Sequence, residues 1–114
     1  FLQMTRFNEE LQFSIEIEED SGLIKDIPYL ALQICIENVI KHNSATIESP
    51  LKTRIIIKKD SVIISNNLQK KASPEQSNNF GLKYVQSIYN YYSKKDFKTF
   101  EENGNFICIL PLID

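Results

Sequence analysis

Three parts of the chain have hydrophobic patterns that predict β-strands. Residues 11–19 alternate strictly and predict a strand with one face in a core and one face in water. Residues 52–59 and 61–66 are β-branched runs with a short polar break between them, and they predict a hairpin. Residues 96–102 and 105–113 predict a second hairpin, because Asn103-Gly104 between them tolerates positive φ.

A helical period marks two other segments. Residues 28–43 predict a helix with Pro28 in its first turn and one broad apolar face, formed by Leu32, Cys35, Ile36, Val39 and Ile40. Residues 80–92 predict a second helix, with its apolar residues at Leu82, Val85, Ile88, Tyr89 and Tyr92. The segment 68–79 has no period and is rich in Ser, Pro, Asn, Gln and Lys, so we expect a long loop there.

The start of the chain, "FLQMTRF", also has apolar residues at helical spacing, and we expect the end of a longer helix there. The predicted order is then helix, strand, helix, two strands, loop, helix and two strands. A mixed, mostly antiparallel sheet covered on one face by helices fits this order. The predicted fold class is therefore a two-layer α/β (α+β) sandwich.

Composition limits the chain to one soluble domain. It has 114 residues, 42% of them hydrophobic and 25% charged, and a net charge of −2. The charge argues against a general nucleic-acid or membrane-surface binder, and no apolar run is long enough to span a bilayer. Cys35 and Cys108 each lie in an apolar run, which predicts buried free thiols in a reducing compartment. Two cysteines and one histidine make a poor metal-ligand set.

Four polar residues interrupt the helix predicted over 28–43: Glu37, Asn38, Lys41 and His42. One interpretation is a solvated helix face, with Glu37 and Lys41 as an ion pair four residues apart. The other interpretation is that this edge of the helix faces a ligand. The helix alone does not decide between them.

Two later segments favour a ligand. Asn66 and Asn67 end an apolar strand, where side chains reach the rim of a sheet. Gly81 and Leu82 begin a helix directly after the long polar loop. A helix start offers unpaired backbone N–H groups, and a glycine there lets a phosphate approach closely. The order of these features predicts a nucleotide site.

With these residues in place, the sequence resembles the ATP-binding domain of sensor histidine kinases, the Bergerat fold of the GHKL group, and within it the LytS-like branch. "IPYLALQICIENVIKHN" resembles the N-box helix of that branch, and "FGLKYVQSIYNYY" its phosphate-binding helix. "NGNFICILPL" resembles its closing hairpin, and "FLQMTRF" the segment that ends its dimerisation helices. The resemblance divides the chain into residues 1–8, the end of the upstream dimerisation helix, and 9–114, the ATPase domain.

The resemblance implies ATP and Mg²⁺ as cofactors and a role for each candidate residue. Asn38 would coordinate Mg²⁺, and Glu37 would act as general base on a histidine of the substrate helix. Lys41 and His42 would contact the phosphates or the ribose. Asn66, with Asn67 next to it, would meet the adenine amino group. Residues 68–79 would form the ATP lid, and Gly81 with Leu82 the phosphate-binding helix start.

The resemblance also implies a parent protein. The phosphoacceptor histidine would lie on dimerisation helices upstream of Phe1, in a homodimeric kinase that phosphorylates a response regulator and does not bind nucleic acid directly. The fragment would be the cytoplasmic domain of an inner-membrane-anchored sensor kinase.

The chain departs from the family pattern at two places. Asn66 replaces the adenine-reading aspartate of Asp-x-Gly-x-Gly and both of its glycines are absent, while Asn79 replaces the first glycine of Gly-x-Gly-Leu. These changes leave open a non-catalytic or weakly binding nucleotide or docking module on the same fold. An anti-sigma type GHKL serine kinase is a further alternative, against which "FLQMTRF" argues.

Overall fold

The computed structural model describes residues 2–7, 11–18, 29–69, 80–92 and 96–112. It contains six strands and two helices within these ranges. They are β1 (Leu2–Phe7), β2 (Leu11–Ile17), α1 (Tyr29–His42), β3 (Leu51–Ile57), β4 (Ser61–Asn67), α2 (Phe80–Tyr92), β5 (Lys98–Glu102) and β6 (Asn105–Pro111).

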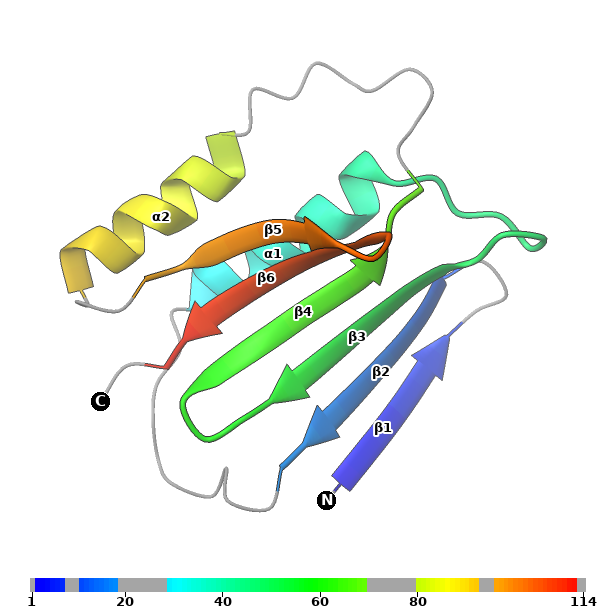
Figure 1. Cartoon of the computed structure of the whole chain (residues 1–114), viewed down its shortest axis with the longest axis horizontal. Helices are drawn as coiled ribbons and strands as arrows, with labels where there is room; N and C mark the ends of the chain where they lie inside the picture. Colours follow the sequence, from blue (N-terminus) through cyan, green and yellow to red (C-terminus); the bar gives the residue numbers. More distant parts are fainter. Residues whose placement is uncertain (1, 8–10, 19–28, 70–79, 93–95, 113–114) are drawn as a thin grey trace.

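The six strands form one mixed sheet in the order β1-β2-β3-β4-β6-β5 (Figure 1). β2 and β3 are parallel, and every other neighbouring pair is antiparallel. A parallel pair needs a crossover connection, and α1 lies in the chain between β2 and β3. The predicted mixed, mostly antiparallel sheet is therefore confirmed.

The helices lie on one side of the sheet (Figure 1). α1 contacts β4 and β6, and α2 packs against α1. The strands face this layer with alternate residues, as shown by β3, in which Leu51, Thr53 and Ile55 are buried while Lys52 and Arg54 are exposed. The core lies between the two layers, and the expected two-layer sandwich is confirmed.

α2 is also attached to the C-terminal end of β6. The Tyr89 hydroxyl donates a hydrogen bond of 2.7 Å to the carbonyl oxygen of Pro111. The ring of Tyr89 stacks on Phe97, with 5.9 Å between centroids and 7° between planes. Offset stacking of this kind adds to the apolar contact that buries both rings.

The expectation of a helix at the start of the chain is wrong for the residues that the structure describes there. Leu2–Phe7 forms β1, paired antiparallel with β2 so that Met4 lies opposite Ile15. Six residues are fewer than two helical turns, and in "LQMTRF" apolar and polar residues also alternate over the first four positions. The open edge of β2 decides the choice, because it offers unpaired backbone groups to a neighbouring strand.

Both predicted helices are confirmed, but the buried row of α1 differs from the predicted face. Ala31, Cys35 and Val39 are buried, while Ile40 is 43% exposed. The three buried residues are spaced four apart and form the narrow stripe that two neighbouring elements can cover.

The second hairpin is confirmed in detail, with Asn103 at φ 52° and Gly104 at φ 78° between β5 and β6. Cys35 and Cys108 are buried and free, as predicted. No helix within the described ranges is long and apolar enough to cross a membrane.

Candidate nucleotide site

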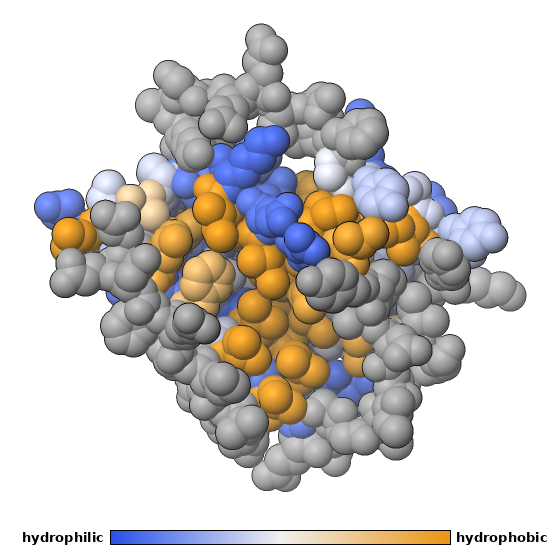
Figure 2. All heavy atoms as spheres, turned by 180° about the vertical axis from the view of Figure 1, so that it is seen from behind, coloured by the Kyte–Doolittle hydropathy of each residue, from blue (hydrophilic) through white to orange (hydrophobic). Residues whose placement is uncertain are grey.

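The polar residues of α1 lie in two rows with different surroundings. Gln33, Glu37 and Lys41 are exposed, and the Gln33 amide donates to the Glu37 carboxylate at 3.1 Å. Ile34, Asn38 and His42 are half-buried and also spaced four apart, so they share one edge of the helix. In Figure 2, which shows the helix side, a narrow hydrophilic band crosses a hydrophobic surface.

The row that contains Asn38 faces the start of α2. A Cβ atom added to Gly81 would lie 3.0 Å from Cγ2 of Ile34, so the two helices are in close contact there. Asn38 lies one helical turn from Ile34 on the same edge. Asn38 therefore lies one helical turn from the point where α1 contacts the first turn of α2, which contains Gly81 and the half-buried Leu82.

The contact also changes the interpretation of Gly81. From the sequence, we expected this glycine to allow the close approach of a phosphate. In the structure its missing side chain leaves room for Ile34, which is a sufficient reason for glycine by itself.

Asn66 is the last residue but one of β4, lies on the helix-facing side of the sheet and is 1% exposed. Its amide nitrogen donates to the carbonyl oxygen of Asn67 at 3.0 Å. Its amide oxygen Oδ1 is buried and has no hydrogen-bond partner in the described structure. Buried polar atoms are nearly always paired in native proteins, so an unpaired acceptor at this place indicates a missing donor.

Asn67 is not brought together with these residues. It alternates with Asn66 along β4 and lies on the opposite, open face of the sheet. Its amide oxygen accepts from the backbone N–H of Lys52 at 2.7 Å, and its amide nitrogen donates to the carbonyl oxygen of Pro50 at 3.2 Å. Both polar atoms of the amide bind backbone groups at the start of β3. Asn67 therefore has a structural role that the sequence did not predict.

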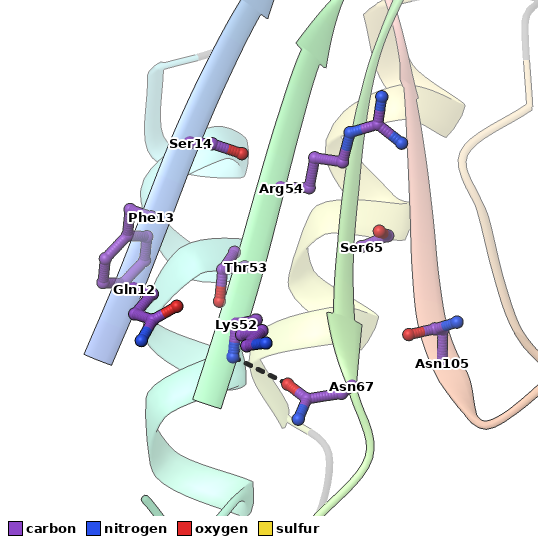
Figure 3. A pocket seen from close by; sticks show the side chains of 9 residues that line it. All are labelled: Gln12, Phe13, Ser14, Lys52, Thr53, Arg54, Ser65, Asn67 and Asn105. Atoms are coloured by element: carbon purple, nitrogen blue, oxygen red, sulfur yellow. Dashed lines mark hydrogen bonds between the residues drawn. The ribbon is translucent and has the colours of Figure 1, made fainter. Parts of the chain in front are cut away.

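A pocket of about 440 Å³ lies on this open face, bordered by Asn67, Lys52, Arg54 and Ser65 among others (Figure 3). Arg54 forms a two-point ion pair with Glu16, at 2.8 Å for each of its hydrogen bonds. The guanidinium lowers the pKa of the Glu16 carboxyl and the carboxylate raises the pKa of Arg54. Arg54 and the Asn67 amide are thus already paired within the protein.

Asn43 and Gln69, which no sequence pattern singled out, join the end of α1 to the chain after β4. Asn43 is buried; its amide nitrogen donates to the Val39 carbonyl oxygen and its amide oxygen accepts from Gln69 N–H, both at 2.9 Å. The Gln69 amide nitrogen donates at 2.9 Å to the carbonyl oxygens of Ser44 and Ser49. This network fixes the point from which the predicted lid leaves the sheet. Residues 70–79 of that lid, with Asn79, lie outside the described residues.

The residues present could bind Mg²⁺ only together with a bound nucleotide. Within the described ranges no group of three or more His, Cys, Asp or Glu could hold a metal ion. The Asn38 amide makes no hydrogen bond to another described residue and offers one neutral oxygen. Mg²⁺ accepts such an arrangement when phosphates and waters supply its other ligands.

No protein-family model matches the chain, and no curated protein matches it. Among solved structures, the chain is similar to the Acinetobacter baumannii histidine kinase AdeS, with a TM-score of 0.53 and 13% identity. The match covers 92% of this chain and 55% of that chain, so this chain spans little more than half of that kinase's length. At this identity the likeness concerns the fold: the chain has a histidine-kinase-like α+β fold.

Proposed function

We propose that the chain is the ATP-binding catalytic domain of a sensor histidine kinase of the LytS-like branch, a protein-histidine kinase fragment without its phosphoacceptor. The nucleotide binds on the helix side of the sheet, between the end of α1, the end of β4 and the start of α2. The whole parent would transfer the γ-phosphate of ATP to a histidine on its dimerisation helices.

The unpaired Oδ1 atom of Asn66 is the observation that carries the proposal. Because the amide nitrogen is used by Asn67, the atom left over is an acceptor, which suits the exocyclic amino group of adenine. An unsatisfied buried acceptor costs roughly 1–3 kcal/mol. A bound adenine removes this cost.

The roles proposed for the other residues come from the resemblance to the family. Asn38 supplies an oxygen to Mg²⁺ beside the first turn of α2, whose N–H groups and dipole favour phosphate. Lys41 and His42 follow within one turn and contact the phosphates or the ribose. Phosphoryl transfer needs mainly such positioning and charge neutralisation.

Glu37 acts as general base toward the incoming histidine. It is exposed on the outer row of α1, where a substrate helix from outside the domain can reach it. Its present partner, the Gln33 amide, is a neutral side chain that can be displaced.

The partners follow from the same proposal. The domain works with the dimerisation helices of its own parent in a homodimer and with a cognate response regulator, and the parent is anchored in the inner membrane with this domain on the cytoplasmic side.

Calorimetric titration of ATP with Mg²⁺ and with EDTA tests the proposal. Asn38→Ala should weaken Mg-dependent ATP binding by at least about 1.4 kcal/mol, or tenfold, with little effect on folding. Asn90→Ala is the matched control, since Asn90 is an exposed asparagine on α2. Equal affinities of wild type and Asn38→Ala for ATP in Mg²⁺ would show that the polar edge of α1 is only a solvated face.

A non-catalytic nucleotide or docking module is the second candidate. The use of Gly81 for packing against Ile34 and the asparagine at position 66 favour it. Glu37→Gln separates the two. In a kinase, ATP binding is kept while transfer to the parent's histidine helices, supplied with the domain, slows by roughly 10²-fold or more. Absence of transfer by the wild-type domain, with ATP binding intact, would favour the docking module.

The third candidate, the GHKL serine kinase, is strengthened by the presence of β1. The likeness of "FLQMTRF" to the end of a dimerisation helix spoke against this candidate, but the described part of the segment is a strand. Transfer to a serine of a protein substrate is therefore the alternative outcome of the same labelling experiment.

A further inference from the structure

A second buried polar atom without a partner lies beside Asn66. The hydroxyl oxygen of Thr53 has no hydrogen-bond partner in the described structure, and the residue is 3% exposed. Of the three buried polar residues of the described core, Asn43 is fully engaged, so Thr53 and Asn66 are the two with an orphaned atom.

The pairing of the strands places these two atoms together. Thr53 of β3 lies directly opposite Asn66 of β4 in an antiparallel pair, so both side chains leave the same face of the sheet. Opposite residues of such a pair have Cβ atoms about 4.5–5.5 Å apart. The two side chains make no hydrogen bond to each other, and both unpaired atoms are buried on this face of the sheet.

Their surroundings are apolar on every side that the sheet defines. Phe13 is the neighbour of Thr53 on β2, and Phe106 is the neighbour of Asn66 on β6. The preceding and following residues on this face of β3 are Leu51 and Ile55, both buried. The Thr53 hydroxyl and the Asn66 acceptor thus lie side by side across β3 and β4, between two phenylalanines on the neighbouring strands. The next residues along β3 on this face are aliphatic.

Water from the open-face pocket does not explain the Thr53 hydroxyl. Thr53 borders that pocket, but its hydroxyl oxygen is closed to solvent. Its buried side chain follows the alternation of β3 toward the helices, while Lys52 and Arg54 face the pocket.

We infer that Thr53 is a second base-recognition residue, whose hydroxyl donates a hydrogen bond to the N1 atom of adenine while Asn66 accepts from the neighbouring amino group. This assignment rests on the proposed nucleotide site. An adjacent donor and acceptor on one edge of a planar, apolar ring is the chemistry that the row Phe13–Thr53–Asn66–Phe106 complements. A hydroxyl can supply the donor, and the Asn66 amide oxygen is the acceptor.

Two substitutions isolate the hydroxyl. Thr53→Val keeps the shape and removes the hydroxyl, and Thr53→Ser keeps the hydroxyl and removes a methyl group. Removing an unpaired buried hydroxyl should raise the unfolding midpoint of the nucleotide-free protein by roughly 4 °C or more. The same Thr53→Val protein should bind Mg-ATP about tenfold more weakly, while Thr53→Ser stays within about threefold of wild type.

The probes are ATP and 1-deaza-ATP, in which a C–H group replaces N1, titrated calorimetrically with Mg²⁺. We expect the penalty of Thr53→Val for ATP to vanish for 1-deaza-ATP. Equal ATP affinities of wild type and Thr53→Val, or a lower unfolding midpoint of that variant, would overturn the role of Thr53 alone. Absence of ATP binding by the wild-type protein would overturn the proposed function and this assignment with it.

Discussion

At the scale of single residues, the thiol of Cys35 and the phenol of Tyr89 hold their protons more tightly than they would in water. Hydrogen bonding with Cys108 and burial both raise the pKa of Cys35 above its ordinary value of 9.0. Burial, and then the neighbouring Cys35, raise the pKa of Tyr89 above 10.0. Both groups are neutral when protonated, so the folded state binds more protons than the unfolded state once the pH exceeds these ordinary values.

The free energy of unfolding should therefore be steady below about pH 9 and fall as the pH rises above it, because the unfolded chain gains stability by ionising its thiol and phenol. Urea unfolding at pH 7, 9 and 10 measures this slope. Cys35→Ala should make the slope shallower, whatever its effect on absolute stability, and Ser87→Ala, an exposed position on α2, should leave it unchanged. A slope that Cys35→Ala leaves as steep as in wild type would contradict the prediction.

At the scale of elements, α1 and α2 approach each other closely at the start of α2. Gly81 and Ile34 meet where an added Cβ would lie 3.0 Å from Cγ2, closer than ordinary van der Waals contact. Asn38 lies one helical turn from Ile34 on the same edge of α1. The hydrogen bonds between Asn43 and Gln69 fix the chain at the other end of the proposed site.

Gly81→Ala should destabilise the protein by about 1–3 kcal/mol, because the extra methyl group pushes α2 away from α1. In an Ile34→Leu background the cost should be smaller, since leucine has no methyl branch at Cβ where Cγ2 of Ile34 stands. Chemical unfolding of the wild type, both single variants and the double variant gives the coupling energy. Additive effects of the two substitutions would show that the helices do not meet at this contact.

At the scale of the whole molecule, β1 is the edge of the sheet and pairs only with β2 among the described strands. β2 then joins the rest of the sheet through its parallel pairing with β3. Loss of β1 would expose the backbone groups along one side of β2, and exposed edges of this kind favour association between molecules.

Removal of residues 1–7 should leave a cooperative fold of lower stability that associates more readily. The far-ultraviolet circular dichroism should lose strand signal and keep its helical signal, because both described helices lie elsewhere. Dichroism and light scattering over a concentration series measure the two effects. A clear loss of helical signal on truncation would support a helix at the start of the chain in place of β1.

The sequence determined most elements of this protein because their patterns are local and long enough to be distinctive. The fourteen residues of α1, the alternation of β2 and Asn103-Gly104 each exclude other conformations through side-chain periodicity or φ. It also singled out Asn38, Asn66 and Gly81, since polar and glycine residues interrupt apolar runs there.

Only the tertiary structure decided on which face of a helix or strand those residues lie and which residues they contact. Leu2–Phe7 became a strand because a free edge was beside it, and Asn66 and Asn67 were separated by the alternation of one strand. Gly81 packs against Ile34, 47 residues away in the sequence. Thr53 could be recognised as a candidate only because strand pairing places it opposite Asn66. Strand pairing and helix contact join residues distant in sequence, and no local pattern records such partners.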